Sequence, residues 1–184
     1  MQADFDDALL GLALPPGCAE ALLEASQLRG DAEREMAALM RAQALAPEHP
    51  AVLIAFYRSH FYGHRLRPAR DLARRALLAG AAALGLPAVW REVPALALPG
   101  ARFDATTRFY LFALKGYAYL SLRLGEADEA RDALALLRAL DPEDRVGAAV
   151  LEAVRQRGLA GEAEDEGLPA ATGAAAWARL PQTA

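Results

Sequence analysis

Cysteine and lysine are almost absent from this 184-residue chain. Cys18 is the only cysteine, so neither an internal disulfide nor a cysteine-rich zinc site can form, which fits a reducing cytoplasm. Lys115 is the only lysine among 20 Lys and Arg residues, and together with the abundant alanine and glycine this composition is typical of a GC-rich bacterial genome. Acidic residues stand near the N-terminus, where a secretory signal carries positive charge, so we predict a cytoplasmic protein.

Long apolar runs and catalytic motifs are missing as well. The longest uncharged run, 76–90, is shorter than the ~18 residues of a spanning helix, and Gly80, Gly85 and Pro87 interrupt it, which predicts no membrane span. No GxGxxG, GxxxxGKS/T or GxSxG string occurs, so the sequence predicts neither an enzyme nor a cofactor site. The net charge of −4 argues against a nucleic-acid partner, because such a partner is bound by a basic surface.

The residues that are present favour helices. Apolar residues make up 54% of the chain, which excludes wholesale disorder. Most of them are alanine and leucine, the strongest apolar helix formers, whereas β-branched residues are few. The length fits one domain with a core of its own. We therefore predict an all-α protein.

A repeated spacing organises these helices. Gly30 is followed by Pro47 seventeen positions later, and Gly125 is followed by Pro142 at the same interval. Each glycine can end a helix in a left-handed conformation, and each proline can stop the next helix. In both copies the helix that the proline closes is rich in Ala and Leu.

This pattern resembles the tetratricopeptide repeat, a ~34-residue pair of antiparallel helices. The resemblance implies a right-handed stack of helix pairs, with small residues such as Ala42, Ala69 and Ala118 where helices approach closely. His64 stands in place of a turn glycine, with Gly63 adjacent to it. The predicted organisation is a lead-in (1–15), repeats 16–49 and 50–83, an insertion (84–110), a third repeat (111–144), a capping helix (145–158) and an acidic, Ala-rich tail (159–184). Another antiparallel helical bundle is the alternative.

Local patterns predict how the later elements begin and pack. Asp104 or Thr106 is predicted to cap the long helix that follows the insertion. In the capping helix, one apolar side is predicted to cover the end of the stack, as repeat proteins require. That side contains Val146, Ala149, Val150 and Ala153.

The resemblance also implies a concave groove, lined by the first helix of each repeat, in which a partner lies. The groove positions fall on Glu20, Glu24 and Gln27 in the first repeat, on Ile54, Arg58, Phe61 and Tyr62 in the second, and on Phe112, Lys115, Tyr119, Leu122 and Arg123 in the third. Aromatic residues and arginine are enriched at binding hot spots. We therefore predict an adaptor or scaffold that binds a peptide or protein surface. A dedicated assembly chaperone is the alternative.

Several features leave the details of this surface open. Phe61, Tyr62 and Phe112 could equally belong to the core. The family's clamp for acidic chaperone tails needs Lys and Asn where Glu20 and Glu24 stand, which disfavours that subclass. If the groove prediction is right, a double change of Arg58 and Lys115 to glutamate abolishes binding without loss of stability.

Other candidate sites have weaker support. His60 and His64 share a helix face at a spacing that can bind metal, but a third ligand is missing. We therefore favour ordinary roles for the two histidines in packing and helix capping, and we predict no metal site. Cys18 lies near a helix start, where a thiol pKa can fall, and could belong to a redox regulator. The arginines at 65, 67, 70, 74 and 75 form a basic surface that could receive an acidic partner, the chain's own tail or a second copy. Trp177 is predicted to dock onto the stack.

Overall fold

The computed structural model describes residues 14–98 and 104–159, and every regular element in these ranges is helical. The elements are α2 (Cys18–Gln27), α3 (Ala32–Leu45), α4 (Pro50–Tyr62), α5 (Leu66–Leu84), a 3-10 turn η1 (Trp90–Glu92), α6 (Ala105–Arg123), α7 (Ala127–Leu140) and α8 (Ala148–Leu159). The prediction of an all-α protein is confirmed for this part of the chain. The lead-in and the tail, including Trp177, lie outside it.

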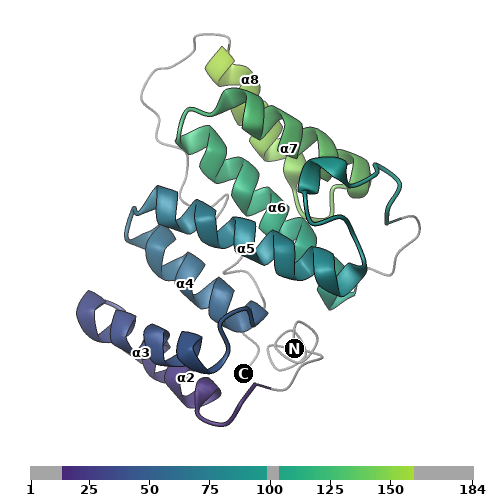
Figure 1. Cartoon of the computed structure of the whole chain (residues 1–184). Coiled ribbons are helices and arrows are strands. Elements are labelled where there is room, and N and C mark those ends of the chain that lie inside the picture. Colours follow the sequence, from purple (N-terminus) through teal and green to yellow (C-terminus); the bar gives the residue numbers. More distant parts are fainter. Residues whose placement is uncertain (1–13, 99–103, 160–184) are drawn as a thin grey trace.

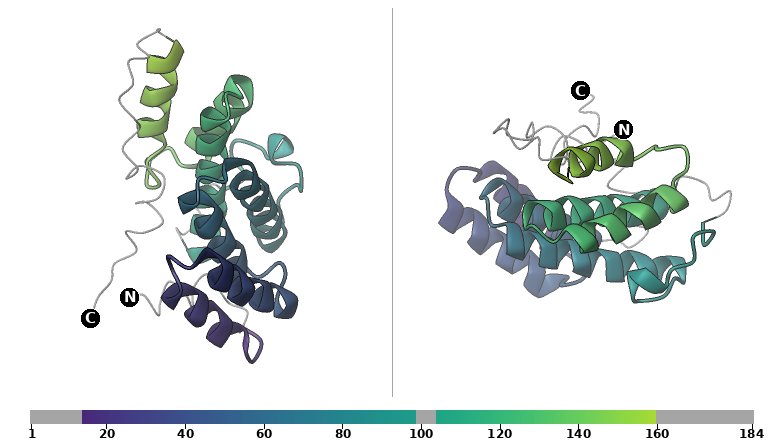
Figure 2. Two further views of the ribbon diagram at one scale, coloured as in Figure 1. Left: turned by 90° about the vertical axis from the view of Figure 1, so that its left-hand side faces the viewer. Right: turned by 90° about the horizontal axis from the view of Figure 1, so that it is seen from above.

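Consecutive helices fold back on one another and pack in pairs (Figure 1). The pairs α2–α3 and α4–α5 fall in the ranges predicted for the first two repeats, with α5 reaching one residue further, to Leu84. The pair α6–α7 belongs to the predicted third repeat. Figure 2 shows α8 at the end of the molecule opposite α2, where it contacts α7 and α6. The pairs α4–α5 and α6–α7 join through a large α5–α6 contact, whereas α3 and α4 pack less closely.

Glycines and a capping aspartate end and begin the helices as predicted, except that His64 rather than Gly63 adopts the left-handed conformation after α4. Gly30 and Gly125 have φ angles of 107° and 77°, the left-handed conformation that glycine adopts at little cost. After α4 it is His64, with φ 55°, that takes this conformation, while Gly63 keeps φ −79°. Asp104 is the cap of α6, because its carboxylate accepts the Thr107 N–H at 2.8 Å. Six residues predicted as insertion, 105–110, therefore belong to α6.

Helix α6 lies at the centre of the molecule and is buried on almost every side. Its buried residues include the unbroken run from Ala113 to Ser121, which is typical of a helix surrounded by other helices. Small residues allow these neighbours to approach, since a Cβ on Gly80 of α5 would stand 3.2 Å from the Tyr110 ring.

The prediction of which side of the capping helix faces the stack is wrong. Val150 is exposed, as are Ala149 and Ala153, and the side that packs inward carries Ala148 and Leu151 instead. The loop before α8 sets this rotation, because the Asp144 carboxylate accepts the backbone N–H groups of Ala148 and Ala149 and so fixes where the first turn begins. Val146, in that loop, is buried as expected.

Two tyrosines of α6 provide a first prediction about stability. Tyr110 is fully buried and its hydroxyl has no hydrogen-bond partner, whereas the Tyr117 hydroxyl donates to Glu129. Tyr110→Phe is expected to raise the free energy of unfolding by about 1 kcal/mol because it removes an unsatisfied buried group. Tyr117→Phe is expected to lower it by about 1–3 kcal/mol because it removes a hydrogen bond to a carboxylate. Urea denaturation of both variants measures the difference.

The buried Tyr110 hydroxyl also makes stability depend on alkaline pH. Burial raises the pKa of Tyr110 from 10.0 to about 12, so above pH 10 the unfolded chain releases this proton before the folded one does. The folded wild type therefore loses stability between these two values. The advantage of Tyr110→Phe over the wild type should grow across that window. An advantage that stays constant would show that the hydroxyl is hydrated in the folded state.

Candidate partner-binding surface

A cluster of four aromatic rings joins α4 to α6. Phe61 is its centre, with ring centroids 5.8 Å from stacked Tyr57, 5.7 Å from Tyr62 at an edge-on angle of 83°, and 5.8 Å from Tyr119 of α6. Such geometries are favourable for aromatic pairs. Gly116 of α6 leaves room for the Tyr57 side chain, because a Cβ there would stand 3.1 Å from the Tyr57 hydroxyl.

Burial is graded across this ring cluster, defined by Tyr57, Phe61, Tyr62 and Tyr119. Tyr57 and Tyr119 are buried, Phe61 is half-buried and Tyr62 is 50% exposed. Whether the rings of Phe61 and Tyr62 belong to the core or to the surface thus differs between the two residues. Phe61 packs against the core, whereas Tyr62 presents half of its surface to solvent. Phe112, Ile54 and Leu122 are also half-buried and pack against the core.

Two arginines flank the rings. Arg123 at the end of α6 donates through Nη1 to the Tyr119 hydroxyl at 3.0 Å, and its guanidinium lies 5.9 Å from the centre of that ring. Arg58 of α4 is half-buried, and its Nε is out of contact with solvent and has no hydrogen-bond partner. Burial, and then the charge of Arg29, lower the pKa of Arg58, and Tyr62 opposes this shift.

Lys115 lies beneath this surface, which corrects its predicted place in the groove. The side chain is only 5% exposed, and its Nζ donates to the Val146 carbonyl at 2.6 Å in the loop before α8. Burial lowers the pKa of Lys115, against the opposing effect of Asp144. The loop covers the ammonium, so Lys115 is not open to a partner. The double change of Arg58 and Lys115 would test folding rather than binding.

The positions predicted in the first repeat are all exposed on α2. Glu20 and Gln27 face solvent, while Glu24 is ion-paired with Arg41 of α3. The charge of Arg29, which follows α2 and was not among the predicted positions, lowers the pKa of Arg58. The spacing of the repeat did not identify it because it lies in the loop.

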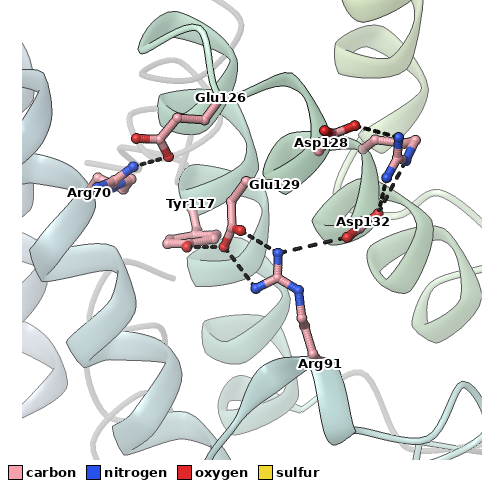
Figure 3. Close-up of polar contacts among 8 residues, drawn as sticks. Arg70, Arg91, Tyr117, Glu126, Asp128, Glu129 and Asp132 are labelled. Atoms are coloured by element: carbon pink, nitrogen blue, oxygen red, sulfur yellow. Dashed lines mark hydrogen bonds and ion pairs between the residues drawn. The ribbon is translucent and has the colours of Figure 1, made fainter.

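A second polar cluster, which sequence reasoning missed, holds the insertion against α7 (Figure 3). Arg91 of η1 binds Glu129 through both Nη atoms and approaches Asp132, and Tyr117 donates to the same Glu129. Burial, which raises the pKa of Glu129, is outweighed by the hydrogen bonds from Arg91 and Tyr117, so the pKa lies below its usual value. Arg91 and Glu129 are 38 positions apart, and no local pattern connects them.

Comparison with known proteins identifies a relative in Azotobacter chroococcum mcd 1, the "Uncharacterized 19.8 kDa protein in nifW 5'region". The two sequences are 40% identical over 153 residues, covering 80% of this chain and 84% of the relative. The chain belongs to the family of this protein. No family model and no solved structure matches it.

The histidine and cysteine sites do not gain support from the geometry. Cys18 is fully buried, its Sγ lies 3.6 Å from the Ala42 carbonyl, and burial followed by Glu20 raises the pKa of its thiol, opposite to the expected helix-start effect. His60 is half-buried and His64 is exposed. Within 14–98 and 104–159, no three His, Cys, Asp or Glu side chains are grouped to hold a metal ion.

Two arginines of the predicted basic surface on α5 are paired with carboxylates. Arg70 pairs with Glu126, Arg75 pairs with Glu48, and Arg67 and Arg74 are exposed. None of the helices described here has the length and apolar character needed to cross a membrane. The ring cluster with its flanking arginines is therefore the strongest candidate for a binding surface.

Proposed function

We propose that this protein is a non-catalytic adaptor that binds a partner protein or peptide on the α4–α6 surface. The observation that carries the proposal is half-exposed Tyr62 one helical turn after Arg58, a half-buried guanidinium that pairs with no carboxylate of the described residues. An exposed aromatic ring and an arginine in one place form the combination enriched at binding hot spots. The partner supplies apolar contact to the ring and hydrogen-bond acceptors to the arginine.

In the same proposal the helix pairs form a tetratricopeptide-like, right-handed stack in the bacterial cytoplasm. The pairing of α2 with α3, α4 with α5 and α6 with α7 supports it, as do the left-handed glycines at the predicted turns. The surface then lies along the first helices of the second and third pairs. The ring cluster connects those two helices across the stack.

Affinity capture with variants of Tyr62 tests this function. Tyr62→Ala is expected to reduce recovery of the specific partner by about tenfold, because the ring is the most exposed member of the cluster. Leu78→Ala on α5 is the matched control, since Leu78 is 45% exposed and contributes no ring to the surface. Circular dichroism should give the same helicity and melting temperature for both variants.

The outcome also separates adaptor from assembly chaperone. A partner recovered in near-equal amount as a lasting complex supports the adaptor, and a partner bound only before its own assembly supports the chaperone. Because the relative is named for its position beside nifW, the nifW product is the first purified candidate to test. Equal capture by Tyr62→Ala and wild type would contradict the proposed surface.

A further inference from the structure

Helix α8 ends the described part of the chain, and the outward side of its first two turns is apolar. This side carries Ala149, Val150 and Ala153, which are all exposed, and Val150 shows 47% of its surface. The opposite side, with buried Ala148 and Leu151, faces α7 and α6. The last helix of a repeat stack needs a polar outer face to remain soluble. The described residues leave this apolar side uncovered.

The size of the outward side indicates what can cover it. Helix α8 has 12 residues, which makes it about 18 Å long and about 10 Å wide. One side of such a helix offers roughly 200 Å², whereas each partner of a stable protein complex buries about 800 Å². A single tryptophan buries about 150–250 Å². The side is therefore too small to hold a second copy or a separate protein, but it matches one indole.

The chain itself carries a tryptophan after α8. Trp177 lies in the apolar run from 174 to 180, and residues 160–173 separate this run from the end of the helix. A chain of that length reaches about 45 Å at most when fully extended, more than twice the length of α8. The first two turns of α8 are thus within reach of Trp177. Attachment to the same chain also gives the indole a high effective concentration at this side, which a free partner lacks.

The charges along this path favour the same return. Arg157 is exposed in the last turn of α8. The residues that follow the helix include the acidic group Glu162, Glu164, Asp165 and Glu166. A chain that reverses after α8 keeps these carboxylates near the guanidinium, and opposite charges attract.

We propose that the segment 174–180 returns along α8 and that the Trp177 indole packs on Ala149, Val150 and Ala153, completing the cap at this end of the molecule. The small alanine side chains leave room for a flat ring beside Val150. This gives the docking of Trp177 that the sequence predicts a defined place. Because α8 lies at the end opposite α2 (Figure 2), the inference does not depend on the proposed partner surface.

Disulfide trapping in the full chain tests the proposal. Ala178→Cys, beside Trp177, is combined with Ala149→Cys on α8 or with Ala135→Cys, the matched control at an exposed alanine of α7. The pair with position 149 should form an intramolecular disulfide about tenfold faster in diamide, because the bond requires Cα atoms within about 7 Å of each other. Cys18 is fully buried and is left unchanged.

The trapping experiment has outcomes that would overturn the proposal. Equal rates for the two pairs would show that the segment does not prefer α8. Disulfide-linked dimers in place of monomers on a denaturing gel would show that the tail belongs to a second copy. Adding Trp177→Ala to the pair with position 149 should remove its advantage, because the indole supplies the apolar contact. An advantage that persists without the indole would contradict its assigned role.

Tryptophan fluorescence gives a second measurement without added cysteines. The emission of Trp177, taken as the difference between the wild type and Trp177→Phe, should lie at shorter wavelength than that of an indole in water. Val150→Glu should shift this emission to longer wavelength and increase its quenching by acrylamide, because a carboxylate is unfavourable against an apolar ring. Ala135→Glu, the same charge at an exposed position of α7, should leave the emission unchanged. A fully solvent-exposed Trp177 in the wild type would exclude the proposed contact.

Discussion

Lys115→Glu is expected to destabilise the protein by about 3–5 kcal/mol, a large part of the 5–15 kcal/mol that typically holds a domain together. In the wild type the ammonium donates to the Val146 carbonyl, and Asp144 lies close enough to act on its charge. A carboxylate at the same place would face a carbonyl oxygen and a second carboxylate with no donor between them. Urea denaturation measures the loss as a lower transition midpoint.

Lys115→Met separates the effect of the charge from that of the side-chain length. Methionine fills a similar space but cannot donate to Val146, so the variant should lose about 1–3 kcal/mol, the penalty of one unsatisfied buried acceptor. The order of stability should be wild type, then Met, then Glu. If Lys115→Glu is as stable as the wild type, the side chain can reach solvent, and the earlier interpretation of Lys115 as a partner contact would be restored.

Local features were predictable from the sequence because they depend on neighbouring residues. Gly30 and Gly125 end helices for a reason that lies in their own backbone freedom, and Asp104 caps α6 through a residue three positions away. The aromatic positions of α4 and α6 could also be singled out. Their order of exposure could not, since it depends on how the rings of α4 pack against Tyr119 of α6.

Features that depend on distant segments were not predictable. A single lysine in a groove position looks like a binding residue until the loop 31 residues further on folds over it. Among the described residues Arg58 has no carboxylate partner, and the charge of Arg29, from the loop after α2, lowers its pKa further. In both cases the local sequence singles out the residue, but tertiary packing decides whether its charged group finds a partner within the protein.

The second large effect on stability is expected at Trp90, whose side chain packs the insertion against the helices. Its side chain is 9% exposed, its ring lies 5.9 Å from that of Tyr117, and the Arg91 guanidinium stands 4.4 Å above it. Trp90→Ala is expected to lower the free energy of unfolding by about 3–5 kcal/mol, because a large side chain leaves a cavity that its neighbours fill only in part. Chemical denaturation of the full chain measures this value.

Whether that loss is global or local depends on how the insertion is held. If the ion pair of Arg91 with Glu129 keeps η1 in place without the indole, the whole protein becomes less stable and digestion by trypsin follows global unfolding. If the indole is the main attachment, trypsin cuts at Arg91 while the helices remain folded. Val89→Ala, at a neighbouring residue that is 52% exposed, should change neither stability nor cleavage. We expect early cleavage at Arg91, because an ion pair with a half-exposed arginine contributes far less than a buried indole.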